Sequence, residues 1–172
     1  MKITLLAHDI RSTHNVGAFF RTCDGLGIDR IIFSGYTPYP TLEDDTRLPH
    51  FADKLTRQIH KTALGAETTV TFERFETLND ALNNVKDSIL VALEQSDNSL
   101  TPKQVFAELN KVSGQKEVVL IVGNEIHGVS KEILASVDYI MEIPMHGSKE
   151  SLNVSVATAI ALYELAQVKQ QS

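Results

Sequence analysis

The feature that most limits the folds open to this chain is an alternation of short apolar runs with helical patterns. The strongest runs are largely apolar along their whole length, over 3–7, 30–34, 88–93 and 117–122. Apolar residues at helical spacing follow the first run, over 15–26. Continuously apolar strands are buried on both faces, and such strands separated by helices form parallel sheets. The pattern predicts an α/β fold with a parallel sheet flanked by helices.

Weaker patterns complete the alternation. We expect strands over 70–72 and 139–143, helices over 77–86 and 130–137, and a helix that begins at Thr101-Pro102. The stretch 35–54 is rich in proline and acidic residues, which predicts an irregular functional or interface loop. A domain boundary there is disfavoured because neither side could fold alone. With 172 residues we expect a single domain over 1–172, without extension domains.

Composition narrows the possible locations and partners. The one cysteine, Cys23, permits no intramolecular disulfide, which is typical of a reducing, cytoplasmic compartment. No apolar run reaches the roughly 18 residues of a membrane-spanning helix, so we expect no membrane association. The net charge of −6 argues against nucleic-acid binding by bulk electrostatics. Any binding of RNA must therefore use a local basic cluster.

Several common chemistries lack their sequence signals. The chain has neither GxxxxGK[ST] for a phosphate loop nor GxSxG for a hydrolase nucleophile. The stretch 25–30, GLGIDR, lacks the third glycine of a dinucleotide fingerprint and precedes a strand instead of following one. The six histidines are scattered without metal-ligand spacing, so we expect no metal.

The segment DIRSTHNVGAFFRTCDG carries the first unusual pattern. Asn15 lies where it can cap the following helix, and Gly17 and Ala18 leave the first turn bare, so another group can approach the backbone closely. Arg21 lies one turn beyond Gly17, off the apolar stripe, and could point at that turn. A capped core helix with an exposed arginine explains the pattern equally well.

Two strand–loop–helix junctions carry the others. In LIVGNEIHGVS a strong strand ends in Gly123-Asn124-Glu125, where open α/β sheets bind ligands, although an ordinary turn also uses Gly and Asn. In IPMHGSKESLNVSVA a predominantly apolar helix is expected to start with Ser151, Asn153 and Ser155 in its first turn. A single N-cap explains one polar residue there but not three. We therefore expect these polar residues to line a site.

Together the three segments resemble a family. NxGxxxR (Asn15, Gly17, Arg21), VGNExxGV (122–129) and IPMxGxxxSLNVSVA (143–157) are similar to the three motifs of the SpoU, or TrmH-type, RNA ribose methyltransferases of the SPOUT superfamily. The order and spacing of the motifs both match. The segments ALEQ (92–95) and KTALGAE (61–67) also resemble this family.

The resemblance implies a fold, a cofactor and a reaction. The C-terminal part would form a deep trefoil knot that binds S-adenosylmethionine, and the enzyme would transfer the methyl group to a ribose 2′-hydroxyl of structured RNA. By motif, the cofactor would contact the backbone at Ala92 or Leu93 and at Gly123, Ile143 and Leu152, with Ser151 nearby. The catalytic set carried over in the same way is Arg21, Asn15, Glu125, Ser151 and Asn153.

The family also implies a homodimer in which the arginine of the first motif completes the facing subunit's site. The last helix is apolar on two sides, as a helix between its own sheet and a partner would be. One side carries Leu152, Val156, Ile160 and Tyr163; the other carries Ala157, Ala161, Leu162 and Leu165. A helix buried wholly in its own monomer would show a similar pattern.

The RNA partner is less defined. This chain would be a family member with little beyond the catalytic core, and such members most resemble the enzymes that act on the anticodon loop of tRNA. By this analogy tRNA is the favoured substrate. The candidate RNA-binding cations are Arg11, Arg47, Arg57, Lys61 and Lys149. Two alternatives stay open: a non-catalytic RNA- or cofactor-binding module of the same fold, and a flavodoxin-like nucleotide-binding protein. Incubation with labelled cofactor and tRNA distinguishes the non-catalytic module from an active enzyme. Titration with S-adenosylmethionine distinguishes the flavodoxin-like protein from both.

Overall fold

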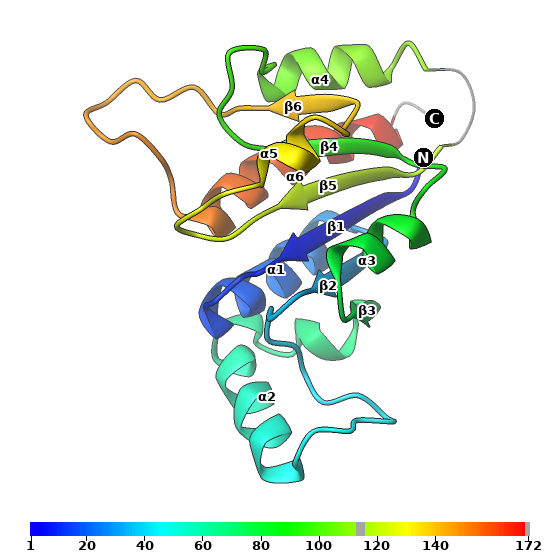
Figure 1. The fold of residues 1–172 in the computed structure, drawn as a ribbon, viewed down its shortest axis with the longest axis vertical. Coiled ribbons are helices and arrows are strands. Elements are labelled where there is room, and N and C mark those ends of the chain that lie inside the picture. The colour runs from blue at the N-terminus through cyan, green and yellow to red at the C-terminus, as the bar shows by residue number, and fades with distance from the viewer. Residues whose placement is uncertain (113–115, 171–172) are drawn as a thin grey trace.

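The computed structural model, which describes residues 1–112 and 116–170, is built on one parallel sheet of six strands (Figure 1). The strand order is β3-β2-β1-β5-β4-β6. The strands are β1 (Ile3–His8), β2 (Arg30–Ser34), β3 (Phe72–Phe75), β4 (Ile89–Leu93), β5 (Val118–Val122) and β6 (Tyr139–Met141). Every neighbouring pair is parallel. The predicted parallel α/β fold is confirmed.

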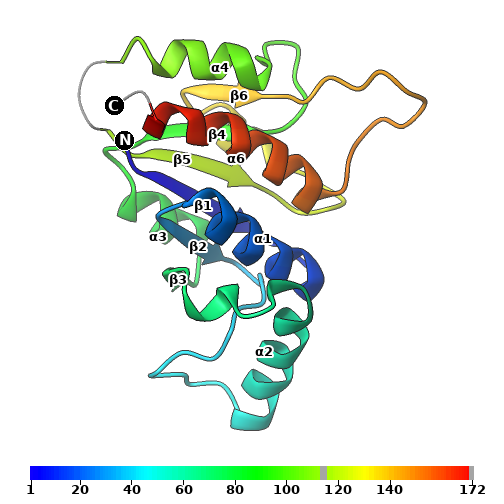
Figure 2. The same cartoon turned by 180° about the vertical axis from the view of Figure 1, so that it is seen from behind.

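Helices cover both faces of the sheet, as continuously buried strands require. One face packs against α1 (Thr13–Leu26), α4 (Pro102–Leu109) and α6 (Val154–Gln170). In Figure 2, α1 and α6 lie in front of the sheet and α4 lies above β6. The other face packs against α3 (Leu78–Asn84) and α5 (Lys131–Leu134), which lie in front in Figure 1. The central strands β1 and β5 are buried along nearly their whole length.

One helix was not predicted from the sequence. The stretch 35–54 is irregular only to residue 48, and α2 (Pro49–Ala63) begins inside it and continues past it, before a 3-10 turn over Ala66–Thr68. Pro49 at the first helical position and buried Ala52, Ile59 and Ala63 are the signals that could have revealed it. The buried residues are widely spaced and two of them are small, so the apolar stripe is weak.

Of two expectations about α1, one is wrong and the other is confirmed. Ser12, not Asn15, is the N-cap: its side-chain oxygen accepts a hydrogen bond from the backbone N–H of Asn15, at 3.3 Å, and Asn15 lies inside the first turn. The close approach expected at Gly17 is made by a neighbouring helix, α2. A Cβ at Gly17 would overlap the Ile59 carbonyl oxygen and the Thr62 hydroxyl of α2. Gly17 therefore sets the close approach of the two helices.

The C-terminal segment wraps around the carboxyl end of β4. This strand lies between β5 and β6, which are joined by α5 on one face, and the chain then returns as α6 on the other face. The wrapping is consistent with a deep trefoil knot, which remains a prediction of the resemblance. The helix begins at Val154, so Ser151 and Asn153 precede it and do not belong to its first turn, contrary to expectation.

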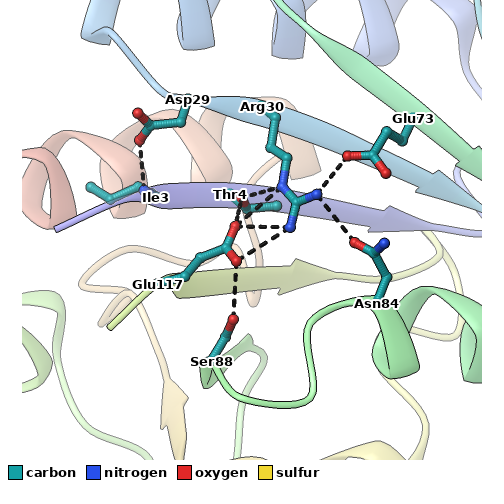
Figure 3. Close-up of polar contacts among 8 residues, drawn as sticks. All are labelled: Ile3, Thr4, Asp29, Arg30, Glu73, Asn84, Ser88 and Glu117. Carbon is teal, nitrogen blue, oxygen red and sulfur yellow. Dashed lines mark hydrogen bonds and ion pairs between the residues drawn. The ribbon is translucent and has the colours of Figure 1, made fainter. Parts of the chain in front are cut away.

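A polar network ties the amino ends of four strands together (Figure 3). Arg30, at the start of β2, pairs with Glu73 of β3 and with Glu117 just before β5. Its guanidinium also donates to Thr4 of β1 and to Asn84 at the end of α3. Because Arg30, Glu73 and Glu117 are paired with one another, we assign a structural role to this end of the sheet. The residues of the sequence motifs lie at the opposite, carboxyl edge.

Candidate active site

A cavity of about 490 Å³ opens at the carboxyl ends of β4, β5 and β6. It is lined by the strand ends, by the loop after β5 and by the residues that lead into α6. Five of the six predicted cofactor contacts line it, namely Leu93, Gly123, Ile143, Ser151 and Leu152. Ala92, which was expected as the alternative to Leu93, is not part of the lining, and its side chain is buried in the core of the other sheet face.

The loop after β5 is packed tightly against the end of β4. Glu94 accepts hydrogen bonds from the backbone N–H groups of Val129 and Gln95, both at 2.9 Å. A Cβ at Gly123 would overlap the backbone of Gly128. The loop therefore needs a glycine at position 123 in order to pack. Because the loop also lines the cavity, the same glycine determines the shape of the cavity indirectly.

Asn124 is a residue whose role the sequence analysis missed. Its side-chain oxygen accepts from the backbone N–H groups of Ile126 and His127, at 2.8 and 2.9 Å. Its amide donates to the carbonyl of Asp9 and to the Tyr36 hydroxyl, at 3.0 and 2.6 Å. All four hydrogen-bonding positions of a side-chain amide are thus used. Asn124 fixes the loop after β5 to the loops after β1 and β2.

A second, shallower hollow borders the cavity. It is lined by Arg11, Ser12, His14, Asn15, Glu125 and Asn153. Glu125 and Asn153 line both spaces, so the cavity and the hollow adjoin. A molecule bound in the cavity and another in the hollow would be neighbours, as a transfer reaction between two substrates requires.

Glu125 anchors the start of α1 to the loop after β5. Its carboxylate accepts from the backbone N–H groups of Arg11 and Ser12, at 3.0 and 3.2 Å, and from the Asn15 amide at 2.9 Å. Burial acts to raise the pKa of Glu125, but these hydrogen bonds outweigh it, and the pKa lies below its ordinary value. Glu125 is therefore an ionised acceptor with its oxygens engaged, and not a proton acceptor poised for neutral pH.

Asn153 links the hollow to α6. Its amide donates to the Asn15 side-chain oxygen at 3.3 Å, and its own oxygen accepts from the backbone N–H and the hydroxyl of Ser155, at 2.8 and 2.7 Å. The polar residues at the helix start thus have separate tasks. Ser151 lines the cavity, Asn153 caps α6 and joins the two spaces, and Ser155 supports the cap.

Arg21 lies apart from both spaces. It is exposed on α1, and among residues 1–112 and 116–170 its side chain has no hydrogen bond and no ion pair. It follows Asn15 by six residues, which is about 9 Å along a helix axis. Within one subunit the structure therefore does not bring Arg21 together with Asn15, Glu125, Ser151 and Asn153.

The predicted RNA-binding cations fall into different surroundings. Arg11 lines the hollow, while Arg57, Lys61 and Lys149 are exposed outside it. Arg47 is engaged within the 35–48 loop: it pairs with Asp45, lies over the Tyr39 ring and donates to two backbone carbonyls. The guanidinium of Arg47 is therefore engaged in stabilising the loop.

The described part of the chain offers few other chemistries. Within it, no three side chains of the metal-ligating types come together as a site. Cys23 is buried on the inner side of α1, and burial raises the pKa of its thiol, which makes it a core residue and not a nucleophile. None of the helices in residues 1–112 and 116–170 has the length and apolar character needed to span a bilayer.

Comparisons with known proteins place the chain among RNA methyltransferases in sequence. The tRNA (guanosine(18)-2'-O)-methyltransferase of Aquifex aeolicus is 29% identical over 171 residues, covering 98% of this chain and 71% of the relative. The enzyme of the same name from Escherichia coli K12 is 27% identical, and the match covers 99% of this chain but 65% of the relative. The chain thus spans about two thirds of these curated relatives.

Solved structures show the same fold. The A. aeolicus TrmH/SpoU tRNA modifying enzyme matches with a TM-score of 0.74 at 28% identity, covering 99% of this chain and 76% of the other. The AdoMet-bound rRNA methyltransferase of Sinorhizobium meliloti matches with a TM-score of 0.71 at 23% identity, covering 99% and 56%. The model of the SpoU rRNA Methylase family matches residues 2–163, so the chain belongs to that family.

Proposed function

We propose that this protein transfers the methyl group of S-adenosylmethionine to a ribose 2′-hydroxyl of structured RNA. The observation that carries the proposal is the shared wall of Glu125 and Asn153 between a cofactor-sized cavity and an open polar hollow. Both residues belong to the motifs of the family. We favour tRNA, and by analogy its anticodon loop, and we place the reaction in the cytoplasm.

The cavity fits S-adenosylmethionine in size and lining. Its volume of about 490 Å³ lies within the range of small-molecule sites. Leu93, Ile143 and Leu152 supply apolar surface for a purine, while the strand ends and Ser151 supply polar groups. S-adenosylmethionine supplies an electrophilic methyl group on a sulfonium, so the protein's task is to place the acceptor hydroxyl and remove its proton.

Glu125, Asn15 and Asn153 are suited to positioning the ribose. They are joined to one another by hydrogen bonds along the border of the cavity, so their geometry is fixed before RNA binds. Glu125 is a poor base because its pKa is lowered by the donors around it. Arg21 has no lone pair with which to accept a proton. In this proposal a phosphate of the RNA takes the proton, and Arg21 holds that phosphate and stabilises the developing alkoxide.

Arg21 reaches the reacting groups only from a second copy of the chain, so the proposal includes a homodimer. Its support is the outward side of α6: Val156, Ile160 and Tyr163 are between 39% and 58% exposed, whereas Ala161, Leu162 and Leu165 are buried. Leu152, which was expected on the same side, precedes the helix and lines the cavity. A stripe of large apolar side chains in water is typical of an interface. A dimer would cover this stripe and bring in the missing arginine.

Two measurements test the proposed function. Titration calorimetry should show one S-adenosylmethionine site per chain, and Leu152→Asp, which puts a charge in the apolar lining, should abolish it. Incubation with methyl-labelled cofactor and bulk tRNA should then label the RNA. A second incubation with bulk rRNA tests the other RNA class. Cofactor binding without transfer to either RNA would favour a non-catalytic module, and absence of cofactor binding would remove the proposal.

A further inference from the structure

The outward side of α2 carries a row of basic side chains. Ala52, Ile59 and Ala63 are buried on the inner side of this helix. Four residues spaced by four, three and four positions occupy the opposite side, and all are exposed: His50, Lys54, Arg57 and Lys61. The row spans about 16 Å, with about 4.5–6 Å between successive members along the axis.

The row has no acidic partners. Within residues 1–112 and 116–170, none of its side chains makes a hydrogen bond or an ion pair. By contrast, Arg30 and Arg47 are paired with carboxylates. Within α2, three cationic side chains stand against the single carboxylate of Asp53, a net charge of +2 in a chain of −6. A local concentration of unpaired positive charge on an acidic protein attracts a polyanion to that place.

We propose that this row, the α2 basic row, docks the sugar–phosphate backbone of the RNA at a distance from the ribose that is modified. The inference rests on the proposed function and names the surface that holds its substrate. The sequence singled out Arg57 and Lys61; the structure adds His50 and Lys54 and excludes Arg47. Regularly spaced, solvated cations suit a chain of phosphates. Phe51, 48% exposed next to the row, adds an aromatic face on which an unpaired base can stack.

The α2 basic row is rigidly connected to the hollow. Thr62, the neighbour of Lys61, donates its hydroxyl hydrogen bond to the backbone carbonyl of His14, at 2.9 Å, and His14 lines the hollow. The close packing at Gly17 fixes the same two helices. Figures 1 and 2 both show α2 extending beyond the sheet, away from β6 and α4. RNA bound along α2 would therefore be held in a fixed relation to Asn15 and Glu125.

An anionic membrane is the competing occupant, and the structure disfavours it. A helix that lies in a membrane surface buries an apolar side below its cationic one. The apolar side of α2 is instead packed into the protein, against α1. The large apolar side chains exposed at this helix, Leu48, Phe51 and Leu64, lie at its two ends and form no continuous side that could insert into a membrane.

The test is salt-dependent binding of bulk tRNA, measured by fluorescence anisotropy. The triple variant Lys54→Gln, Arg57→Gln, Lys61→Gln changes only exposed side chains. It should weaken tRNA binding by at least 10-fold and reduce the slope of log affinity against log salt by about 2–3, at 0.7–0.9 per lost phosphate contact. The matched control, Lys86→Gln, Lys103→Gln, Lys131→Gln, removes the same charge from exposed positions elsewhere and should retain affinity and slope.

The outcomes separate this inference from the proposed function. Both variants should bind S-adenosylmethionine as the wild type does. If the wild type methylates tRNA but the α2 variant keeps its affinity and slope, the docking surface is wrong and the function stands. If the two triple variants lose affinity equally, the attraction is unspecific and the surface is again wrong. If the α2 variant loses binding to phosphatidylserine vesicles while tRNA binding is unchanged, the row binds lipid. A wild type without cofactor binding or transfer removes the function itself.

Discussion

The Asn15 amide donates a hydrogen bond to the Glu125 carboxylate at 2.9 Å, and this contact joins two motifs that are 110 residues apart. It connects the first turn of α1 to the loop after β5, at the border of the cavity and the hollow. The site is therefore assembled by the fold from several loops. Each of the following predictions tests one part of this assembly.

The Glu125 link should make stability depend on pH. Because the pKa of Glu125 is lowered in the folded protein, its contribution is complete above the ordinary glutamate pKa and is lost as the pH falls through the lowered folded value. We expect Glu125→Gln to reduce the free energy of unfolding by about 1 kcal/mol at neutral pH, a value discounted for exposure, and by less at about pH 3. Urea unfolding at several pH values measures both. Glu43→Gln, at an exposed loop carboxylate without a hydrogen bond in the described residues, should show no such difference.

Gly123 should be intolerant of the smallest side chain. In Gly123→Ala the new Cβ overlaps the backbone of Gly128, so the loop must shift and the cavity changes shape. We expect cofactor affinity to fall on the order of 10²-fold, since a misplaced site loses most of its fixed contacts. Gly147→Ala is the matched control, because its Cβ meets nothing within 4 Å. Equal affinities of the two variants by calorimetry would contradict the role assigned to Gly123.

The outward stripe of α6 should hold the dimer. Ile160→Asp places a charge in the middle of that stripe, where 39% of the residue is exposed in the monomer. Burial of an unpaired carboxylate is costly, so we expect sedimentation velocity to show a monomer that retains its fold and lacks methyl transfer. Leu64→Asp, at an exposed leucine outside α6, should leave the oligomeric state unchanged. A monomeric wild type would refute the dimer.

Arg21 should act across that dimer. We expect Arg21→Ala and Asn153→Ala each to be inactive alone and to regain about a quarter of wild-type activity after subunit exchange, since half of the dimers are mixed and each of these has one intact site. Asn153→Ala mixed with Gly123→Ala should regain nothing, because every site then has a damaged cavity. Full exchange without regained activity would show that Arg21 serves its own subunit.

The sequence predicted the sheet well and the polar contacts less well. Strands buried on both faces are apolar throughout, and β2 was predicted at its exact bounds, Arg30–Ser34. The weak stripe of α2 did not show, because Ala52 and Ala63 contribute little hydrophobicity. The cap of α1 was misplaced by three residues, since serine and asparagine both cap helices.

The candidate site shows the same division. Motif positions placed Gly123, Ser151 and Leu152 at one cavity, but spacing along the chain cannot say that Asn124 uses all four of its hydrogen-bonding positions. Nor can it say that Arg47 is held by Asp45. Both facts depend on contacts between loops that are distant in sequence or folded back on themselves. A trefoil knot is likewise beyond local physical arguments.

The most direct test of the account is to identify the atom that receives the methyl group. The protein is incubated with tRNA and S-adenosylmethionine that carries an isotopically labelled methyl group, and the RNA is digested to nucleosides for mass spectrometry. The account predicts that the label appears on the ribose fragment of a 2′-O-methylnucleoside, and that Asn153→Ala eliminates it. Label on the base fragment, or no label in RNA from a protein that binds the cofactor, would contradict it.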